Sequence, residues 1–230
     1  MNSKTWTRIV LALFASLSIP IQLAGHYDGV AITPTASPYN LRASAQNTYQ
    51  IRLNWQEVSG QSQIEFNIYR CRGCSIPRTQ GMKIASVGAN VLSYTDGSAS
   101  KPLVESNTYA YQVTAYKSTG ESGPSNSATA TTNREPAPTN LTSFAFRRGV
   151  DDVVRLSWTD NSTDEDRYRI ERCTGTTCTN FIEIAKTTAN VTMYTNGFEF
   201  AWGQTFRYRV RSHSPGGYSG YSNIRTQTLS

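Results

Sequence analysis

The sequence predicts an all-β fold built from two tandem β-sandwiches, and three observations support that prediction. Apolar and polar residues alternate with a period of two in several short runs, which is typical of strands that bury one face. The mature chain shows no stretch with helical periodicity. The whole pattern occurs twice, in units close to the ~100 residues of a common sandwich domain.

The internal repeat appears as short stretches of matching sequence. RLNW at 52–55 returns as RLSW at 155–158, and Ser125-Asn126 returns as Ser222-Asn223. Further matches join YTDG at 94–97 to YTNG at 194–197, and Tyr111-Gln112-Val113 to Tyr208-Arg209-Val210. The spacing changes only between matched stretches, where loops on a common scaffold tolerate length differences.

Within each repeat, the alternating runs predict strands in chain order. Ile51, Leu53 and Trp55 fall on one face of the first clear run, and the later runs follow the same rule. The clearest predicted strands are 51–55, 66–68 and 109–113 in the first repeat, and 155–158, 168–171 and 206–211 in the second. Turn residues separate the runs at 96–97, 118–120, 196–197 and 215–217.

The N-terminus has the layout of a secretory signal peptide. Lys4 and Arg8 precede an apolar run at 9–23, and small residues follow it. We therefore expect a signal peptide at 1–24, with an uncleaved anchor as the alternative. The remaining parts are predicted as an N-terminal extension (25–36), a first domain (37–132), a linker (133–136) and a second domain (137–230).

The net charge and the expected export of the chain limit the kinds of molecule that it could bind. The formal charge is +6, and removing Lys4 and Arg8 with the signal peptide leaves 20 basic against 16 acidic residues, or +4. The basic residues are interspersed with acids, whereas nucleic-acid binding needs a concentrated basic stripe. We expect a secreted or extracellular protein, at the cell surface or in the periplasm, with no nucleic-acid partner and no membrane span in the mature chain.

Several motifs resemble those of fibronectin type III domains. Each repeat has a proline-led first strand, at 37–41 and 137–141, and a tryptophan on the next strand, Trp55 or Trp158. The resemblance, which includes bacterial members of the family, covers nearly all of the mature chain. It implies two immunoglobulin-like, seven-stranded β-sandwiches, a fold that hosts binding, spacing and scaffolding roles alike.

The same resemblance implies a difference between the repeats. Leu103 lies six residues before Tyr109, the spacing of the family's tyrosine corner, in which the hydroxyl bonds back to the backbone. The second repeat has Phe200 and Phe206 at those places. The second domain should therefore lack that hydrogen bond.

Four cysteines form two close pairs at equivalent places in the repeats. Cys71 is followed by Cys74, and Cys173 by Cys178. In an exported protein this predicts one local disulfide per domain. A zinc site shared between the pairs and a redox-active pair are the weaker alternatives.

The sequence offers little catalytic chemistry. No serine or cysteine has a readable base partner, and no glycine-rich phosphate loop precedes a helix, so we expect neither an enzyme nor a cofactor. Asp160, Asp164 and Asp166 have the odd spacing of a calcium loop, but Glu165 occupies the position of the bend glycine. A solvated turn is the favoured interpretation, and calcium binding is the weak alternative.

One sheet face is the strongest candidate for ligand binding. Strands C and F are neighbours in this fold, so the outward residues of the second domain should form a cationic face made of Arg167, Arg169, Arg207, Arg209 and Arg211. The matching face of the first domain should be neutral and aromatic, with Tyr69 and Tyr116. Arginine suits anionic groups, and tyrosine suits sugar rings or a partner protein.

Three functions remain open from the sequence. The first is a non-enzymatic extracellular adhesion or scaffold protein. The second is an accessory module that binds anionic extracellular polysaccharide through the arginine face. The third is a subunit of a surface fibre that self-assembles by adding residues 26–36 as a strand to a neighbouring copy.

Overall fold

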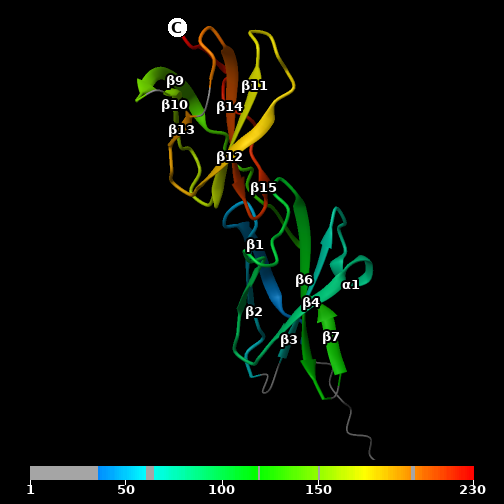
Figure 1. Ribbon diagram of the computed structural model, residues 1–230. Coiled ribbons are helices and arrows are strands. Elements are labelled where there is room, and N and C mark those ends of the chain that lie inside the picture. The colour runs from blue at the N-terminus through cyan, green and yellow to red at the C-terminus, as the bar shows by residue number, and fades with distance from the viewer. Residues whose placement is uncertain (1–35, 61–64, 119, 150, 198–199) are drawn as a thin grey trace, which may run out of the picture. The chain divides into compact units, whose positions relative to one another are not determined.

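The computed structural model describes residues 36–60, 65–118, 120–149, 151–197 and 200–230 (Figure 1). The predicted signal peptide and nearly all of the predicted N-terminal extension lie outside these residues. Across the described ranges, no helix is both long enough and apolar enough to cross a membrane.

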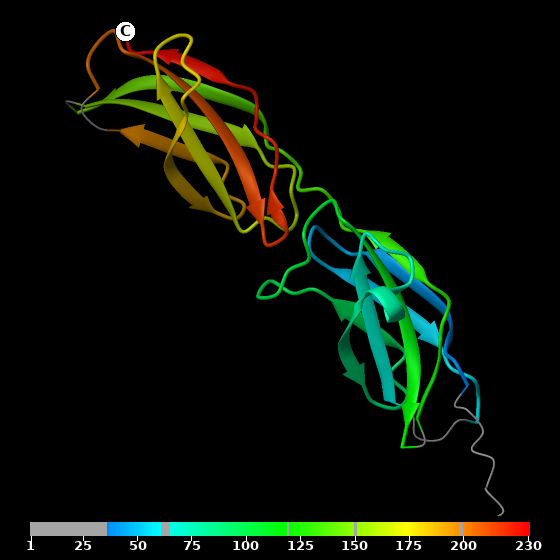
Figure 2. The same ribbon diagram turned by 90° about the vertical axis from the view of Figure 1, so that its right-hand side faces the viewer.

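The first domain is a sandwich of two antiparallel sheets (Figure 2). One sheet has the order β1-β2-β5, and the other has the order β4-β3-β6-β7, with β8 also paired to β6. The strands are β1 (Tyr39–Ala45), β2 (Ile51–Gln56), β3 (Glu65–Arg72), β4 (Met82–Val87), β5 (Ser93–Asp96), β6 (Thr108–Lys117), β7 (Gly120–Pro124) and β8 (Ala128–Thr131).

The second domain repeats this topology strand for strand. Its sheets have the orders β9-β10-β13 and β12-β11-β14-β15, with β16 also paired to β14. The strands are β9 (Thr139–Arg148), β10 (Asp151–Thr159), β11 (Arg167–Thr174), β12 (Ile182–Thr188), β13 (Met193–Gly197), β14 (Thr205–Ser214), β15 (Gly217–Tyr218) and β16 (Arg225–Thr228). The predicted all-β fold with two seven-stranded sandwiches is confirmed, with the last strand of each domain interrupted into two segments.

Each core is built by the period-two alternation read from the sequence. Trp55 is 3% exposed and packs edge-on against Phe66, with ring centroids 5.6 Å apart. Trp158 is 5% exposed and packs against Tyr168 at 5.4 Å. Each contact joins a tryptophan of one sheet to an aromatic residue of the other, so it holds the two layers of the domain together.

Repeated serines interrupt the last strand of each domain. In the second domain, the Ser219 hydroxyl accepts a hydrogen bond from Ser212 N–H at 2.9 Å, and the Ser222 hydroxyl accepts one from Val210 N–H at 3.0 Å. Ser122 and Ser125 do the same for β6 in the first domain. The side chains thus satisfy strand N–H groups that would otherwise lack the carbonyl acceptors of a regular neighbouring strand.

The repeated Ser-Asn dipeptide then joins the last strand to the first. The Asn223 side chain accepts a hydrogen bond from Leu141 N–H at 2.8 Å and donates one to Leu141 C=O at 3.0 Å. Asn126 makes the same two bonds with Leu41. A side-chain amide therefore pairs with the backbone as a strand would, and it links the two sheets of each domain.

The predicted tyrosine corner and both predicted disulfides are present. The Tyr109 hydroxyl accepts a hydrogen bond from Val104 N–H at 3.0 Å. In the second domain, Phe200 and Phe206 instead pack against each other in a tilted arrangement, with ring centroids 4.7 Å apart. The disulfides join Cys71 to Cys74 and Cys173 to Cys178.

One short helix departs from the expected absence of helical structure. α1 (Pro77–Gln80) follows the first disulfide and contains four residues, too few to show any periodicity. Pro77 supplies a preset φ at the first helical position. The backbone N–H of Arg78 donates to Gln112 Oε1 at 3.1 Å, so the helix covers part of the outer face of β6.

Replacing Tyr109 by phenylalanine should lower the stability of the first domain by about 1 kcal/mol, because Val104 N–H loses its acceptor. Chemical denaturation of wild type and variant measures the difference. Phe206→Tyr is the matched change in the second domain and should bring no comparable gain. An unchanged midpoint for Tyr109→Phe would contradict a stabilising role for the corner.

Replacing Asn223 by alanine should cost about 1 to 2 kcal/mol, because two backbone groups of Leu141 lose their partner. Asn126→Ala should have a similar cost in the first domain. Thr226→Ala, an exposed change nearby on β16, is the control and should leave the urea midpoint within error. Equal midpoints for Asn223→Ala and Thr226→Ala would show that the amide clamp contributes nothing.

Candidate functional site

The predicted arginine face lies on the larger sheet of the second domain, which contains β11 and β14. β11 and β14 pair in register, with Arg169 opposite Arg211 and Glu171 opposite Arg209. Arg167 lies opposite His213, and Arg207 lies opposite Cys173. The period of two therefore directs all five arginines to the side of the sheet that faces away from the core.

Aromatic rings separate these arginines in a continuous stack. Arg211 lies 4.4 Å from the ring centroid of Tyr218 and 4.9 Å from that of Tyr221. Arg209 lies 3.6 Å from Tyr221 and 4.3 Å from Phe181. The stack runs in the order Arg169, Tyr218, Arg211, Tyr221, Arg209, Phe181 and Arg207, and we call this set the ladder face.

Carboxylates neutralise much of the charge on the ladder face. Glu171, whose side chain is 7% exposed, pairs with Arg209 at 2.6 Å and with Arg211 at 3.4 Å. The Tyr221 hydroxyl also donates to Glu171, at 3.1 Å. Glu183 pairs with Arg169. Buried, multiply bonded pairs of this kind hold the guanidinium groups in fixed positions.

Two arginines at the ends of the predicted set differ from the rest. Arg167 pairs with Asp166 at 3.1 Å, and His213 contacts the same carboxylate at 2.7 Å. Arg207 donates to the Cys178 carbonyl, and no carboxylate of the described chain lies within ion-pair distance of it. Arg207 is therefore the member of the ladder face whose charge is least compensated.

The matching face of the first domain carries a charged cluster that the sequence pattern did not predict. Glu121 lies at its centre and accepts hydrogen bonds from Tyr69 at 2.7 Å, Asn67 at 3.0 Å and Thr114. Arg78 pairs with the same carboxylate at 3.2 Å. The hydroxyl of Tyr69 is thus already engaged, whereas Tyr116 remains 44% exposed.

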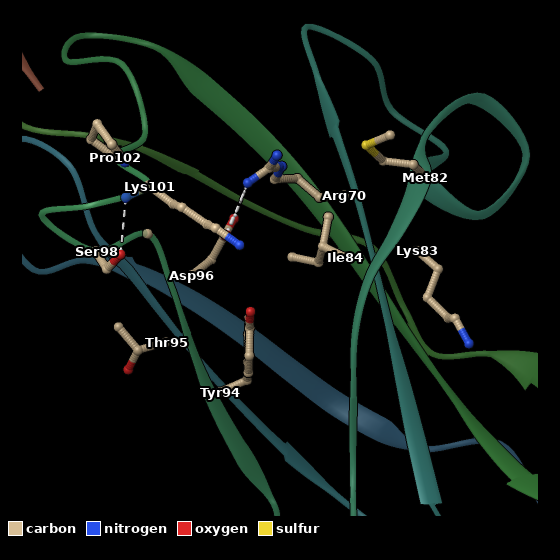
Figure 3. Close-up of a pocket in the computed structure, with 11 residues that line it drawn as sticks. Arg70, Met82, Lys83, Ile84, Tyr94, Thr95, Asp96, Ser98, Lys101 and Pro102 are labelled. Carbon is tan, nitrogen blue, oxygen red and sulfur yellow. Dashed lines mark hydrogen bonds and ion pairs between the residues drawn. The ribbon is translucent and has the colours of Figure 1, made fainter.

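A cleft of about 550 Å³ opens in the first domain where β4 and β5 form the edges of their sheets (Figure 3). Arg70 Nη1 donates to both oxygens of Asp96 at 2.9 Å, and the buried Tyr111 hydroxyl donates to Asp96 at 2.8 Å. Burial and the nearby carboxylate raise the pKa of Tyr111, so this phenol keeps its proton. The second domain has the related set Arg172, Asn196 and Tyr208.

The polar groups of the acidic turn bond to other groups of the chain. Asp160 accepts a hydrogen bond from Ser162 N–H at 2.9 Å, and Asp164 N–H donates to the Ser162 hydroxyl at 3.4 Å. Asp166 pairs with Arg167 instead. In the ranges that the structure describes, no group of three or more His, Cys, Asp or Glu residues is placed to hold a metal ion.

The sequence interpretation missed the partners that complete these sites. The aromatic residues of the ladder face lie outside the alternating runs: Tyr218, Tyr221 and Phe181. The period-two pattern therefore could not predict that they contact the arginines. Glu121 lies beyond the turn after β6 and reaches back over the sheet. The set around Arg70 could have been found from the sequence, because Arg70 and Tyr111 recur as Arg172 and Tyr208 in the second repeat and Asn196 stands at the position of Asp96.

The Glu121 cluster should make the first domain sensitive to acid. Although burial opposes ionisation, hydrogen bonds from Thr114, Asn67 and Tyr69 and the charge of Arg78 lower the pKa of Glu121 to about 2. Because the folded pKa lies below the ordinary value of 4.5, the stabilisation is complete above that pH and is lost as pH falls towards 2.

Denaturation series between pH 6 and pH 2 measure this contribution. The stability of wild type should fall more steeply below the ordinary glutamate pKa than that of Glu121→Gln, which has no carboxylate to protonate. Glu65→Gln, an exposed carboxylate on the neighbouring strand β3, is the control and should follow wild type. Parallel curves for wild type and Glu121→Gln would contradict the depressed pKa.

Comparisons with known proteins find similarity at the level of structure alone. No protein-family model and no curated protein matches the sequence. The chain is similar to a two fibronectin type-III domain segment from chicken tenascin, with a TM-score of 0.42 and 13% identity over 84% of this chain and 100% of that one.

It is also similar to the FN1-FN3 domains of chicken CNTN1, with a TM-score of 0.38 and 12% identity over 86% of this chain and 66% of that one. The strand order of the two sandwiches, rather than these similarities, identifies the fold. Each domain packs a three-stranded sheet on a sheet of five strand segments, the last two of which form one interrupted strand, and carries the proline and tryptophan described above. The chain consists of two tandem domains with the fibronectin type III fold.

Proposed function

We propose that this chain is a non-enzymatic extracellular adhesion or scaffold protein whose ladder face contacts a partner protein. The observation that carries the proposal is the stack of alternating arginine and aromatic side chains on one flat sheet face. Tyrosine and arginine are enriched among the residues that dominate binding at protein interfaces. Tyr218 and Tyr221 are each 38% exposed, so their rings are available to a partner.

Preorganisation strengthens this interpretation. Free arginine side chains lose rotamer freedom on binding, which costs affinity. In the ladder face, the rings and Glu171 already hold Arg209 and Arg211 in place. The two disulfides support an oxidising, extracellular setting in which such a surface would act.

We also propose residues 133–136 as the linker of this scaffold. β8 ends at Thr131 and β9 begins at Thr139, and the intervening stretch contains Pro136 and Pro138. Proline restricts the backbone, so a short stretch of this kind acts as a semi-rigid spacer.

Anionic polysaccharide is the alternative ligand for the same face. Arg207 supports it, because its charge has no carboxylate partner in the described chain. Charge reversal at Arg169 or Arg209 is a poor test, since these residues hold Glu183 and Glu171. Tyr221→Ser and Arg207→Glu are cleaner changes, because neither of them removes an ion pair.

Retention of protein-coated beads on extracellular material from the source organism tests both ligands. For a protein partner, Tyr221→Ser should lower retention about fivefold or more, and protease treatment of the material should abolish it. For a polysaccharide, Arg207→Glu should have the larger effect, retention should resist protease, and an alginate column should retain the wild type at low salt. Equal retention of wild type and both variants would show that the ladder face binds neither a partner protein nor a polysaccharide in this material.

The fibre alternative has a separate test. Self-assembly through residues 26–36 should increase the apparent size with concentration, and deletion of that stretch should abolish the increase. A constant size over the series would exclude it.

A further inference from the structure

We propose that the cleft between β4 and β5 of the first domain binds a carboxylate of an extended acidic peptide. This site lies outside the ladder face and does not depend on the function proposed for it. Figure 3 shows Ile84, Tyr94 and the Arg70–Asp96 pair around the cleft. The walls combine apolar contact surface with a few fixed polar groups, which is typical of ligand sites.

Arg70 supplies the anchor for the carboxylate. Its Nη1 atom binds both oxygens of Asp96, and no described residue accepts a hydrogen bond from its Nε or Nη2 atoms. The Arg70 side chain is 27% exposed and lines this cleft. It also lines a second, adjoining cleft that is bordered by Tyr109. One edge of the guanidinium is thus fixed to the protein, and the other edge can receive a carboxylate in a bidentate pair.

Asp96 also lines the cleft, but its side chain is only 6% exposed and its oxygens already accept hydrogen bonds from Arg70 and Tyr111. Its charge offsets that of Arg70, but Lys101 adds a further positive charge at the mouth. Lys83 also borders the cleft, although its amine points away from it in Figure 3.

Backbone hydrogen bonds and a glycine fix the turn that carries Lys101. Ser98 and Lys101 exchange two backbone hydrogen bonds of 3.1 Å, which close a tight turn. Gly97 precedes the turn with a φ of +92°, and a Cβ there would lie 2.0 Å from the Tyr49 carbonyl oxygen. The turn therefore places Lys101 across from Arg70, and Figure 3 shows its side chain extending towards the Arg70–Asp96 pair.

An extended peptide fits this location because two sheet edges border it. β4 ends one sheet and β5 ends the other, so each has an outer edge that no strand of the described chain pairs with. Such edges can pair with the backbone of an added strand, while a side chain of that strand enters a pocket. Charge selects an acidic side chain in this case.

The matched position in the second domain lacks several of the residues that form the cleft in the first domain. Asn196 replaces Asp96, and Glu183 stands at the position of Lys83. The Arg172 guanidinium lies 5.2 Å from the ring of Phe200 and 4.7 Å from that of Phe206, whereas the Arg70 guanidinium lies 5.6 Å from the ring of Tyr109. The matched arginine thus lies over two rings in the second domain and over one ring in the first, where Leu103 stands at the position of Phe200.

Amide NMR titration of the full chain tests the proposal, with acetyl-tetraglutamate amide as the probe and acetyl-tetraglutamine amide as its neutral match. The acidic peptide should shift the signals of residues 94–101 and of Arg70, and the neutral peptide should leave them in place. Lys101→Glu should weaken binding about fivefold or more. Arg42→Glu makes the same charge change on β1, which lies at the opposite edge of the β1-β2-β5 sheet from β5. This variant should bind the acidic peptide as wild type does.

Asp96→Asn provides a second variant that should fold, because the second domain already pairs an arginine with Asn196. Removing the carboxylate should tighten binding of the acidic peptide about threefold. Equal shifts with both peptides, or equal binding by wild type and Lys101→Glu, would overturn the proposal. Binding of tetragalacturonate without binding of the acidic peptide would overturn the peptide assignment and identify a glycan site instead.

Discussion

The register of the two central strand pairs is the constraint on which the rest of the structure depends. β3 pairs with β6, and β11 pairs with β14, each over eight residues without interruption. Because side chains alternate across a strand, a slip by one residue would exchange the core face and the outer face. The same register therefore places Tyr208 and Val210 in the core and Arg209 and Arg211 in the ladder face.

The ends of these central strands are secured by side chains rather than by a continuous neighbouring strand. Paired serines bond the N–H groups of β6 and β14, and Asn126 and Asn223 clamp the first strand of each domain. These serines and asparagines have small polar side chains, and they occur at matched positions in both repeats. Their recurrence follows from the need to satisfy backbone groups where the last strand bends away from its partner.

Arginine serves two different purposes in this chain. In the ladder face, Arg209 and Arg211 lie between rings and share Glu171, so their charge is largely compensated while their geometry is fixed. At the sandwich edge, Arg70 is bound on one side and open on the other. The first arrangement favours a broad, flat contact with a partner, whereas the second favours capture of a single carboxylate.

The sequence by itself determined the fold, the repeat, the disulfides and the face on which each arginine lies. These properties follow from local period, cysteine spacing and turn residues, which need no knowledge of distant contacts. Only the tertiary structure decided which side chains surround the charged groups of the two sheets, because Glu121, Tyr218 and Tyr221 reach the sheets from segments outside the alternating runs. It also decided that Arg70 lies over one ring and borders a cleft while Arg172 lies over two rings, since that difference depends on how rings and loops pack around two arginines that occupy matched positions in the sequence.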